Sequence, residues 1–113
     1  MTVSHITTHI LDTAAGKPAE GVSVRLEARG PEGWTEIGSG TTDADGRVKN
    51  LGPEKSDAGD YRIEFATGEY FEREGVESFF PFVTLAFSLR NPEQHYHVPL
   101  LISPFAYSTY RGS

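Results

Sequence analysis

The 113-residue sequence contains no cysteine and a single methionine. Without cysteine, neither disulfide bonds nor thiolate-bound metal ions can stabilise the fold, and the redox compartment is left open. Basic residues are also scarce, because 10 Lys and Arg stand against 16 Asp and Glu and give a net charge of −6. Nucleic acids and anionic membranes bind electropositive surfaces, so we expect neither as a partner.

Long apolar runs are missing as well. No stretch approaches the roughly 20 apolar residues that cross a bilayer as a helix. The N-terminal "MTVSHITTHI" lacks the basic and then apolar layout of a secretory signal. We therefore expect a cytoplasmic protein, and a periplasmic one if a signal peptide has been removed. The length is typical of one domain, which we expect to span residues 1–113.

Apolar and polar residues alternate with a period of two in "GVSVRLEA", "GDYRIEFA" and "FVTLAFSLR". This pattern is typical of strands with one buried face. Gly- and Pro-containing turn formers such as "RGPEG" and "RNPEQ" separate the segments. The spacing predicts an all-β sandwich. Its strands are expected at 4–12, 22–28, 34–41, a short segment after Gly46, 61–67, 83–90, 96–103 and 106–111. One exception, "TGEYFEREG" from Thr67, predicts a two-turn helix.

All four histidines fall in two β-prone segments, "SHITTHIL" and "HYHVPLL". His5 and His9 are four residues apart, and His95 and His97 are two apart, so each pair is expected on one face of its strand. Imidazoles would cluster if the two strands were neighbours. Scattered surface histidines are the simpler interpretation, and a metal site is a third. Metal is disfavoured because the sequence has no cysteine, no His-Glu-x-x-His helix, and no acidic residue that the spacing aims at the cluster.

Arg47 follows the turn formers "DADG", in which Gly46 is expected to adopt a positive φ. The turn would fix the direction of Arg47 at the start of the next strand. A solvated arginine that balances Asp43 and Asp45 is the simpler interpretation, and such pairs are worth at most about 1 kcal/mol. A calcium loop is disfavoured because the Asp-x-Asp-Gly fragment lacks the remaining ligands.

The C-terminal run "YHVPLLISPFAYSTYRGS" contains Pro99 and Pro104. Proline restricts a strand to an edge or a bulge unless its missing N–H faces outward. In the last strand, Tyr110 and Arg111 are expected on opposite faces. A polar edge strand that resists aggregation explains the composition, and an edge is also where a partner subunit can pair.

Taken together, six segments resemble the transthyretin-related hydroxyisourate hydrolases, in the same order and over nearly the whole chain. They are "HILDTAAGKPAEGVSVRLE", "TTDADGRV", "GDYRIEF", "ESFFPFV", "HYHVPLL" and "YSTYRGS". The first two also occur in other β-sandwich modules, whereas "HYHVPLL" with a final "YRGS" separates these hydrolases from transthyretin. The resemblance implies a transthyretin-like β-sandwich of two four-stranded sheets with one short helix, assembled as a homotetramer around a central channel.

The resemblance also implies an activity and a site. The reaction is hydrolysis of 5-hydroxyisourate to 2-oxo-4-hydroxy-4-carboxy-5-ureidoimidazoline in urate (purine) catabolism, without a cofactor. A histidine would activate water and an arginine would orient the substrate. The family's catalytic positions correspond to His9, Arg47, His97 and Ser113. Tyr110 and His95, together with His9 and Arg47, would bind substrate, and His5 inherits no role. Whether His9 or His97 is the base stays open.

Two other functional classes fit the same fold. A non-catalytic carrier like transthyretin would bind a small ligand and would need no histidine for proton transfer. A purely structural sandwich module is the other alternative, and it would be favoured if the protein were monomeric. The "YRGS" segment favours the hydrolase over the carrier, and a measurement of size in solution separates it from the structural module.

Overall fold

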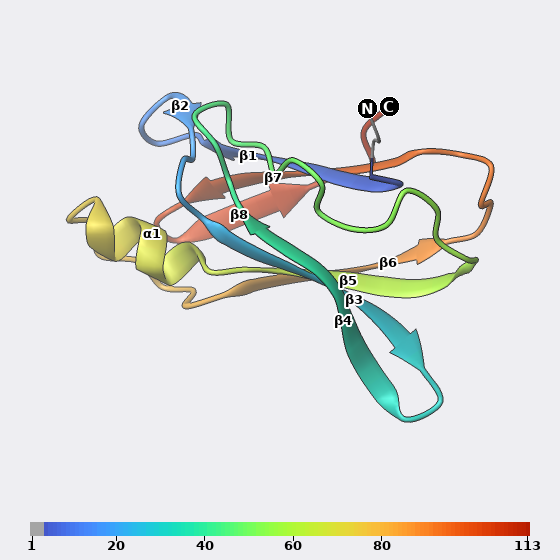
Figure 1. Ribbon diagram of the computed structural model, residues 1–113. Helices are drawn as coiled ribbons and strands as arrows, with labels where there is room; N and C mark the ends of the chain where they lie inside the picture. Colours follow the sequence, from blue (N-terminus) through green and yellow to red (C-terminus); the bar gives the residue numbers. More distant parts are fainter. Residues whose placement is uncertain (1–3) are drawn as a thin grey trace.

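The computed structural model describes residues 4–113 and contains eight strands and one helix within them (Figure 1). The strands are β1 (Ile6–Asp12), β2 (Lys17–Pro18), β3 (Ser23–Gly30), β4 (Gly33–Thr41), β5 (Gly59–Phe65), β6 (Val83–Leu89), β7 (Tyr96–Ser103) and β8 (Ala106–Thr109), and the helix is α1 (Thr67–Arg73). Residues 1–3, part of the stretch on which the prediction of no secretory signal rests, lie outside the described residues.

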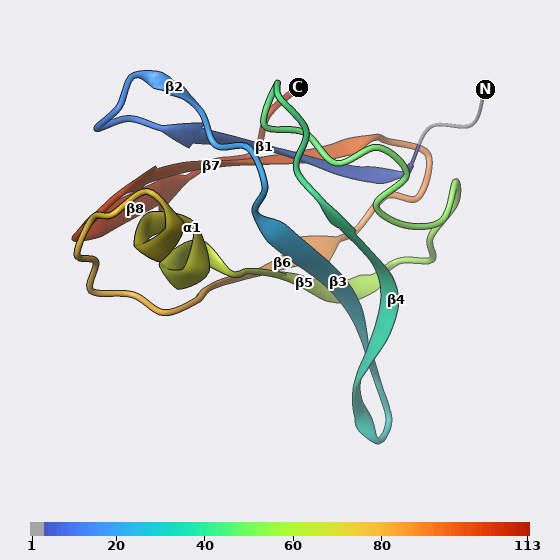
Figure 2. The same ribbon diagram turned by 60° about the vertical axis from the view of Figure 1, so that its left-hand side comes forward.

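The strands form two four-stranded sheets that stack as layers, in the orders β2-β1-β7-β8 and β4-β3-β5-β6 (Figures 1 and 2). The predicted sandwich of two four-stranded sheets with one short helix is confirmed. The alternation of apolar and polar residues explains why the two sheets stack. In β1, for example, Ile6 and Ile10 are buried between the sheets, while Thr7 and His9 on the other face are only half-buried. Each fully buried Leu, Ile or Phe side chain stabilises the core by roughly 1.5–3 kcal/mol.

β1 and β7 run parallel, with Ile6 opposite Tyr96 and Asp12 opposite Ile102. The other strand pairs within residues 4–113 are antiparallel. Parallel neighbours need a long connection, because the chain must return to the starting edge. Here the connection includes the whole second sheet and the helix. It brings segments some ninety residues apart side by side.

The helix α1 lies at one end of the sandwich, between β5 and β6 (Figure 1). Tyr70 and Phe71 are its buried aromatic residues, Arg73 is in its last turn, and Gly75 follows with φ 73°. The predicted two-turn helix is confirmed. Across residues 4–113 no helix has the length and hydropathy to cross a membrane.

Several details of the strand prediction are wrong. The first strand begins at Ile6 and not at residue 4, and the strand expected at 61–67 ends at Phe65. The segment after Gly46 is not a strand: Arg47 forms a single bridge with His9, and the chain then turns at Asn50, whose φ is 58°. The strand β2 was not predicted, because two residues show no alternation. The last strand ends at Thr109 instead of residue 111.

Pro99 accounts for the early end of β8. It lies in β7, an interior strand, so proline does not mark an edge here. The Pro99 carbonyl accepts a hydrogen bond from the Thr109 hydroxyl at 2.7 Å, so the backbone of this residue faces β8. With no N–H on that side, the β7–β8 ladder stops at Leu100 and Thr109 and resumes only at a bridge between His97 and Gly112.

Candidate active site

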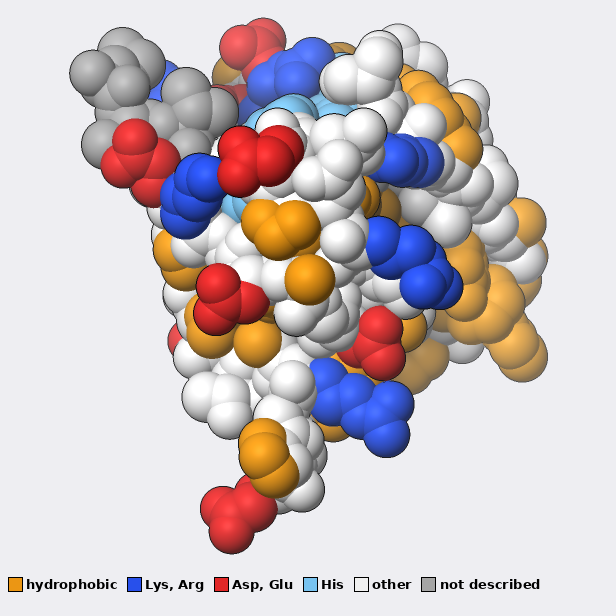
Figure 3. All heavy atoms as spheres, turned by 90° about the vertical axis from the view of Figure 1, so that its right-hand side faces the viewer, with side chains coloured by type: hydrophobic (Ala, Val, Ile, Leu, Met, Phe, Trp, Pro, Cys, Tyr) orange, Lys and Arg blue, Asp and Glu red, His pale blue; other side chains and the backbone are white. Residues whose placement is uncertain are grey.

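Three of the four histidines converge on the outer face of the sheet that contains β1 and β7. Thr7 pairs with His97 and His9 pairs with Pro99, so His9 and His97 are diagonal neighbours across the two strands. Both side chains are half-buried. The two histidine segments are thus neighbours, which is the condition under which a cluster was expected. Histidine side chains are visible near the top of the face in Figure 3, recessed among charged residues.

The turn that precedes Arg47 is closed by backbone and side-chain hydrogen bonds. The Asp43 N–H donates to the Arg47 carbonyl at 2.8 Å, and the Gly46 N–H donates to the Asp43 carbonyl at 2.9 Å. The Asp43 carboxylate accepts the N–H groups of Asp45 at 2.9 Å and Arg47 at 3.1 Å. The bond from Arg47 is the main cause that lowers the pKa of Asp43. Gly46 has φ 76°, as predicted.

This turn is attached directly to β1. The Ile10 N–H donates to the Gly46 carbonyl at 2.8 Å, and Arg47 bridges to His9. Among the ion pairs of residues 4–113, none joins Arg47 to the two aspartates of the turn. The structure therefore anchors the backbone of Arg47 beside His9, with its side chain exposed.

His97 has a lowered pKa. Burial is the largest cause, followed by the positive charge of Arg47 and then by His9 and His95. An ordinary histidine has a pKa of about 6.5, so a lowered value keeps His97 neutral at pH 7. A neutral imidazole has one nitrogen free to accept a proton. His97 Nδ1 lies 2.8 Å from the Thr7 hydroxyl oxygen, which leaves Nε2 as the nitrogen available for chemistry.

His95 joins the same group from the turn before β7. It is exposed, and its Nε2 lies 2.9 Å from the Thr7 hydroxyl oxygen. One hydroxyl thus contacts both His95 and His97. Thr7 was not singled out from the sequence, although its place two residues before His9 puts it on the same face.

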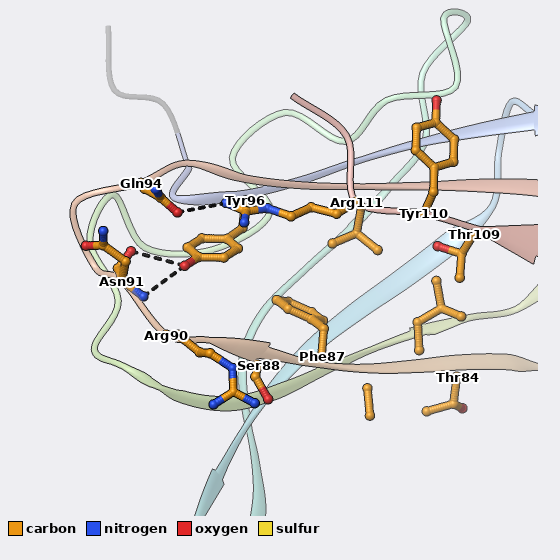
Figure 4. Close-up of a pocket in the computed structure, with 13 residues that line it drawn as sticks. Thr84, Phe87, Ser88, Arg90, Asn91, Gln94, Tyr96, Thr109, Tyr110 and Arg111 are labelled. Carbon is orange, nitrogen blue, oxygen red and sulfur yellow. Dashed lines mark hydrogen bonds between the residues drawn. The ribbon is translucent and has the colours of Figure 1, made fainter.

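The segment 110–113 alternates its side chains across the sheet. Tyr110 is exposed and points away from the space between the sheets (Figure 4). Arg111 points the other way: its guanidinium lies 4.3 Å from the centre of the Tyr96 ring and donates to Gln94 Oε1 at 3.1 Å. The predicted opposite orientation of these two side chains is confirmed.

Gly112 lies against the imidazole of His97. Its N–H donates to the His97 carbonyl at 2.8 Å. A Cβ on this glycine would come within 2.6 Å of His97 Cδ2 and 3.3 Å of Pro99 Cγ, so only glycine allows the approach. Ser113 follows and is exposed. No sequence pattern predicted that this position requires glycine for lack of space.

His5 does not belong to the cluster, and the prediction that it shares a face with His9 is wrong. It is buried and precedes β1, where the alternation rule no longer applies. Its Nδ1 accepts the Ser56 N–H at 2.9 Å and its Nε2 donates to the Gln94 carbonyl at 2.6 Å. Its ring packs against Tyr96 at 6.0 Å. His5 therefore joins three segments of the fold.

A cavity of about 650 Å³ opens between β6 and β8, on the inner side of the sheet (Figure 4). Phe87, Tyr96 and Arg111 line it. Of the predicted site residues only Tyr110 borders it, and its ring points away from the space between the sheets. The histidine cluster therefore lies outside this cavity. Within residues 4–113, no three His, Cys, Asp or Glu side chains are arranged to hold a metal ion.

Comparisons with known proteins agree with this architecture. A family model described as "HIUase/Transthyretin family" matches residues 6–112. The 5-hydroxyisourate hydrolase of Salmonella dublin is 52% identical over 109 residues, which cover 96% of this chain and 80% of that protein.

Two solved structures extend the comparison. The 5-hydroxyisourate hydrolase of Klebsiella pneumoniae is 38% identical, with a TM-score of 0.85 and full coverage of both chains. Sea bream transthyretin in complex with thyroxine is 34% identical, with a TM-score of 0.89 and coverage of 95% of this chain and 93% of that one.

Proposed function

The chain belongs to the HIUase/transthyretin family, and from this premise we propose that it hydrolyses 5-hydroxyisourate to 2-oxo-4-hydroxy-4-carboxy-5-ureidoimidazoline. The relatives from Salmonella dublin and Klebsiella pneumoniae carry the name of that activity. The single observation that carries the proposal is the convergence of His9, Arg47 and His97 on one face of the β1–β7 pair.

The reaction opens a cyclic acyl-urea by attack of water on a carbonyl carbon. It requires a base that removes a proton from the water, a group that stabilises the developing oxyanion, and contacts that orient a flat, carbonyl-rich ring. A neutral imidazole suits the first task, and an arginine suits the second and third through its planar set of N–H donors.

We assign the base to His97. The lowered pKa keeps its imidazole neutral at pH 7, and its Nδ1 is engaged with Thr7, so Nε2 is the nitrogen that would take the proton of water. His9 and Arg47, joined by a backbone bridge, would hold the substrate carbonyls from the adjacent strand. This assignment decides between the two histidines that the sequence left open.

The remaining predicted site residues would enclose the substrate. Tyr110 projects on the side away from the inner cavity, and Ser113 follows the glycine that rests on His97. Both are exposed in the single chain. His95 is adjacent to the cluster and contacts it through Thr7. No cofactor is required by this scheme, because His97 can take a proton from the attacking water and return one to the leaving ring nitrogen when the ring C–N bond breaks.

We also propose that the protein assembles as a homotetramer. The aromatic side chains Phe79, Phe82, Phe105 and Tyr110 are more than half exposed, at 54–67%. Large apolar side chains with this degree of exposure favour a protein interface, where they would be covered. The edge strands β6 and β8 also leave backbone groups available for pairing. Light scattering should give four times the 12.4 kDa chain mass, and a monomer would favour the structural-module alternative.

The activity is tested by generating 5-hydroxyisourate with urate oxidase and following its ultraviolet absorbance with and without the protein. The protein should accelerate the decay. His97→Ala, His9→Ala and Arg47→Ala should each lower the rate by roughly 10²–10³ while circular dichroism stays unchanged. Glu36→Ala, at an exposed position of β4 in the other sheet, is the matched control and should keep full activity.

Two outcomes would redirect the proposal. If the protein does not accelerate the decay but binds an aromatic ligand, the carrier alternative is favoured, as for the transthyretin with which it shares its fold. If a chelator abolishes activity and zinc restores it, the histidine cluster is a metal site instead. We expect the chelator to have no effect.

A further inference from the structure

The Thr7 hydroxyl lies between two imidazole nitrogens. Its oxygen is 2.8 Å from His97 Nδ1 and 2.9 Å from His95 Nε2, both within hydrogen-bond range. Thr7 is the register partner of His97 across the β1–β7 pair, so the backbone of two paired strands fixes the first contact. The second contact comes from the turn that leads into β7.

Proton counting restricts what this arrangement can be. A hydroxyl has one proton to donate and lone pairs to accept with, and a neutral imidazole has one N–H and one bare nitrogen. Thr7 therefore cannot donate to both rings, so two bonds require an N–H on at least one of them. If His97 Nδ1 carries that proton and Thr7 donates to His95, then His97 Nε2 is bare and basic. If the order is reversed, His97 Nε2 holds the proton and cannot act as a base.

We propose that Thr7 sets the tautomer of His97 and passes its proton on to His95. In the resting state His97 Nδ1–H donates to Thr7 Oγ1, and the Thr7 hydroxyl donates to His95 Nε2. Thr7 is thus a positioning residue for the hydrolysis, and this part of the inference rests on the proposed function. The tautomer itself is a property of the free protein.

The proton path away from His97 has three transfers, and it reverses when the ring opens. His97 Nε2 takes a proton from the attacking water, whose oxygen forms the new bond to the substrate carbonyl carbon. His97 then gives its Nδ1 proton to Thr7 Oγ1 as Thr7 gives its own proton to His95 Nε2. His95, now carrying a proton on each nitrogen, releases its Nδ1 proton to solvent. When the ring C–N bond breaks, His97 Nε2 gives its proton to the leaving nitrogen. The relay then runs in reverse, with a proton returning from solvent to His95 Nδ1, from His95 Nε2 to Thr7 and from Thr7 to His97 Nδ1, which restores the resting tautomers.

Burial explains why the path leads to His95. His97 is half-buried beneath Gly112, whereas His95 is exposed and can exchange protons with water. The positive charge of Arg47 and the imidazole of His9 also face His97, and both oppose a lasting charge on its ring. A path through the hydroxyl removes that charge without movement of the backbone that covers the ring.

The first test reads the tautomers by NMR in protein labelled with ¹⁵N at its histidines, recorded above pH 7.5 without substrate. In the wild-type protein, His97 should carry its proton on Nδ1. Thr7→Val has nearly the same shape but no hydroxyl, and it should shift His97 toward the Nε2–H form. Thr7→Ser should keep the wild-type tautomer. Thr35→Val, at an exposed position of β4, is the matched control.

The second test measures turnover of 5-hydroxyisourate. Thr7→Val should lower kcat by about 10²-fold, at the low end of the range for general acid–base groups. Thr7→Ser should restore most of it, and Thr35→Val should change nothing. A His97 protonated at Nε2 in the wild-type protein, or a tautomer that Thr7→Val leaves unchanged, overturns the inference. If the wild-type protein lacks activity, the proposed function fails, and the NMR result still decides the tautomer.

Discussion

A methyl group added at position 112 should lower the activity of this protein strongly and its stability only slightly. Gly112→Ala places a Cβ within 2.6 Å of His97 Cδ2, whereas carbon atoms pack at about 3.5–4.0 Å. The segment or the ring must therefore move by about 1 Å. Gly112 has no positive φ to lose. The effect of Gly112→Ala therefore comes from the steric clash of the added Cβ and not from backbone strain.

The displacement should affect both the unfolding free energy and the rate of catalysis. Displacement of the chain weakens the hydrogen bond from Gly112 N–H to the His97 carbonyl, worth about 0.5–1.5 kcal/mol. For catalysis, a misplacement of about 1 Å can cost on the order of 10²-fold. We expect the unfolding free energy to fall by at most about 1.5 kcal/mol and kcat/KM to fall about 10²-fold.

The assay pairs urea denaturation with the 5-hydroxyisourate decay measurement. Gly30→Ala is the matched control, because its Cβ would meet only one backbone oxygen, at 3.7 Å, and its φ lies outside the left-handed range. This control should leave both quantities unchanged. Wild-type turnover in Gly112→Ala would show that close approach of this segment to the imidazole is not needed for activity.

Three further predictions concern other contacts. Arg47→Ala should raise the pKa of His97 toward its ordinary value, because the guanidinium charge is the second cause that lowers it. NMR titration should show protonation of His97 beginning at higher pH. A His97 titration curve that is the same in the variant and the wild-type protein contradicts this. Tyr70→Phe removes the buried hydrogen bond to the Asp12 carboxylate, 2.8 Å long, and should lower the unfolding free energy by about 1.5–3 kcal/mol in urea denaturation; an unchanged midpoint contradicts this. Arg111→Met keeps a long side chain but loses the charged contacts to Gln94 and to the Tyr96 ring. It should lower kcat/KM while the melting temperature stays close to that of the wild-type protein. A clear fall in melting temperature together with the loss of kcat/KM would assign the arginine to the fold alone.

Much of the sandwich could be predicted because strands and helices have local signatures. Alternation in "GVSVRLEA" follows from one buried face, and the structure buries Val24 and Leu26 and exposes Ser23 and Arg25. The helix was predicted from the break in alternation at Tyr70. Elements of one or two residues have no such signature, so β2 and the bridge at Arg47 depend on the neighbours that the fold supplies.

The site was predictable in part. Spacing put His95 and His97 on one face, but only the tertiary structure shows that β1 and β7 pair in parallel and in the register that joins Thr7 to His97. His5 and His95 each directly precede a strand, because β1 begins at Ile6 and β7 at Tyr96, so spacing alone does not place their side chains. Contacts decide: His95 joins the cluster through Thr7, and His5 does not. The roles of Thr7 and Gly112 required distances.

The parallel pairing of β1 and β7 also affects the order of folding. Thr7 and His97 are ninety residues apart in the chain, so their contact closes one of the longest loops that this chain can form. Closure of a long loop costs more entropy than closure of a hairpin such as β3–β4. The second sheet has mostly nearer partners and can form first. The two halves of the histidine cluster then meet only when the sandwich closes, which makes the appearance of the site a late event in folding.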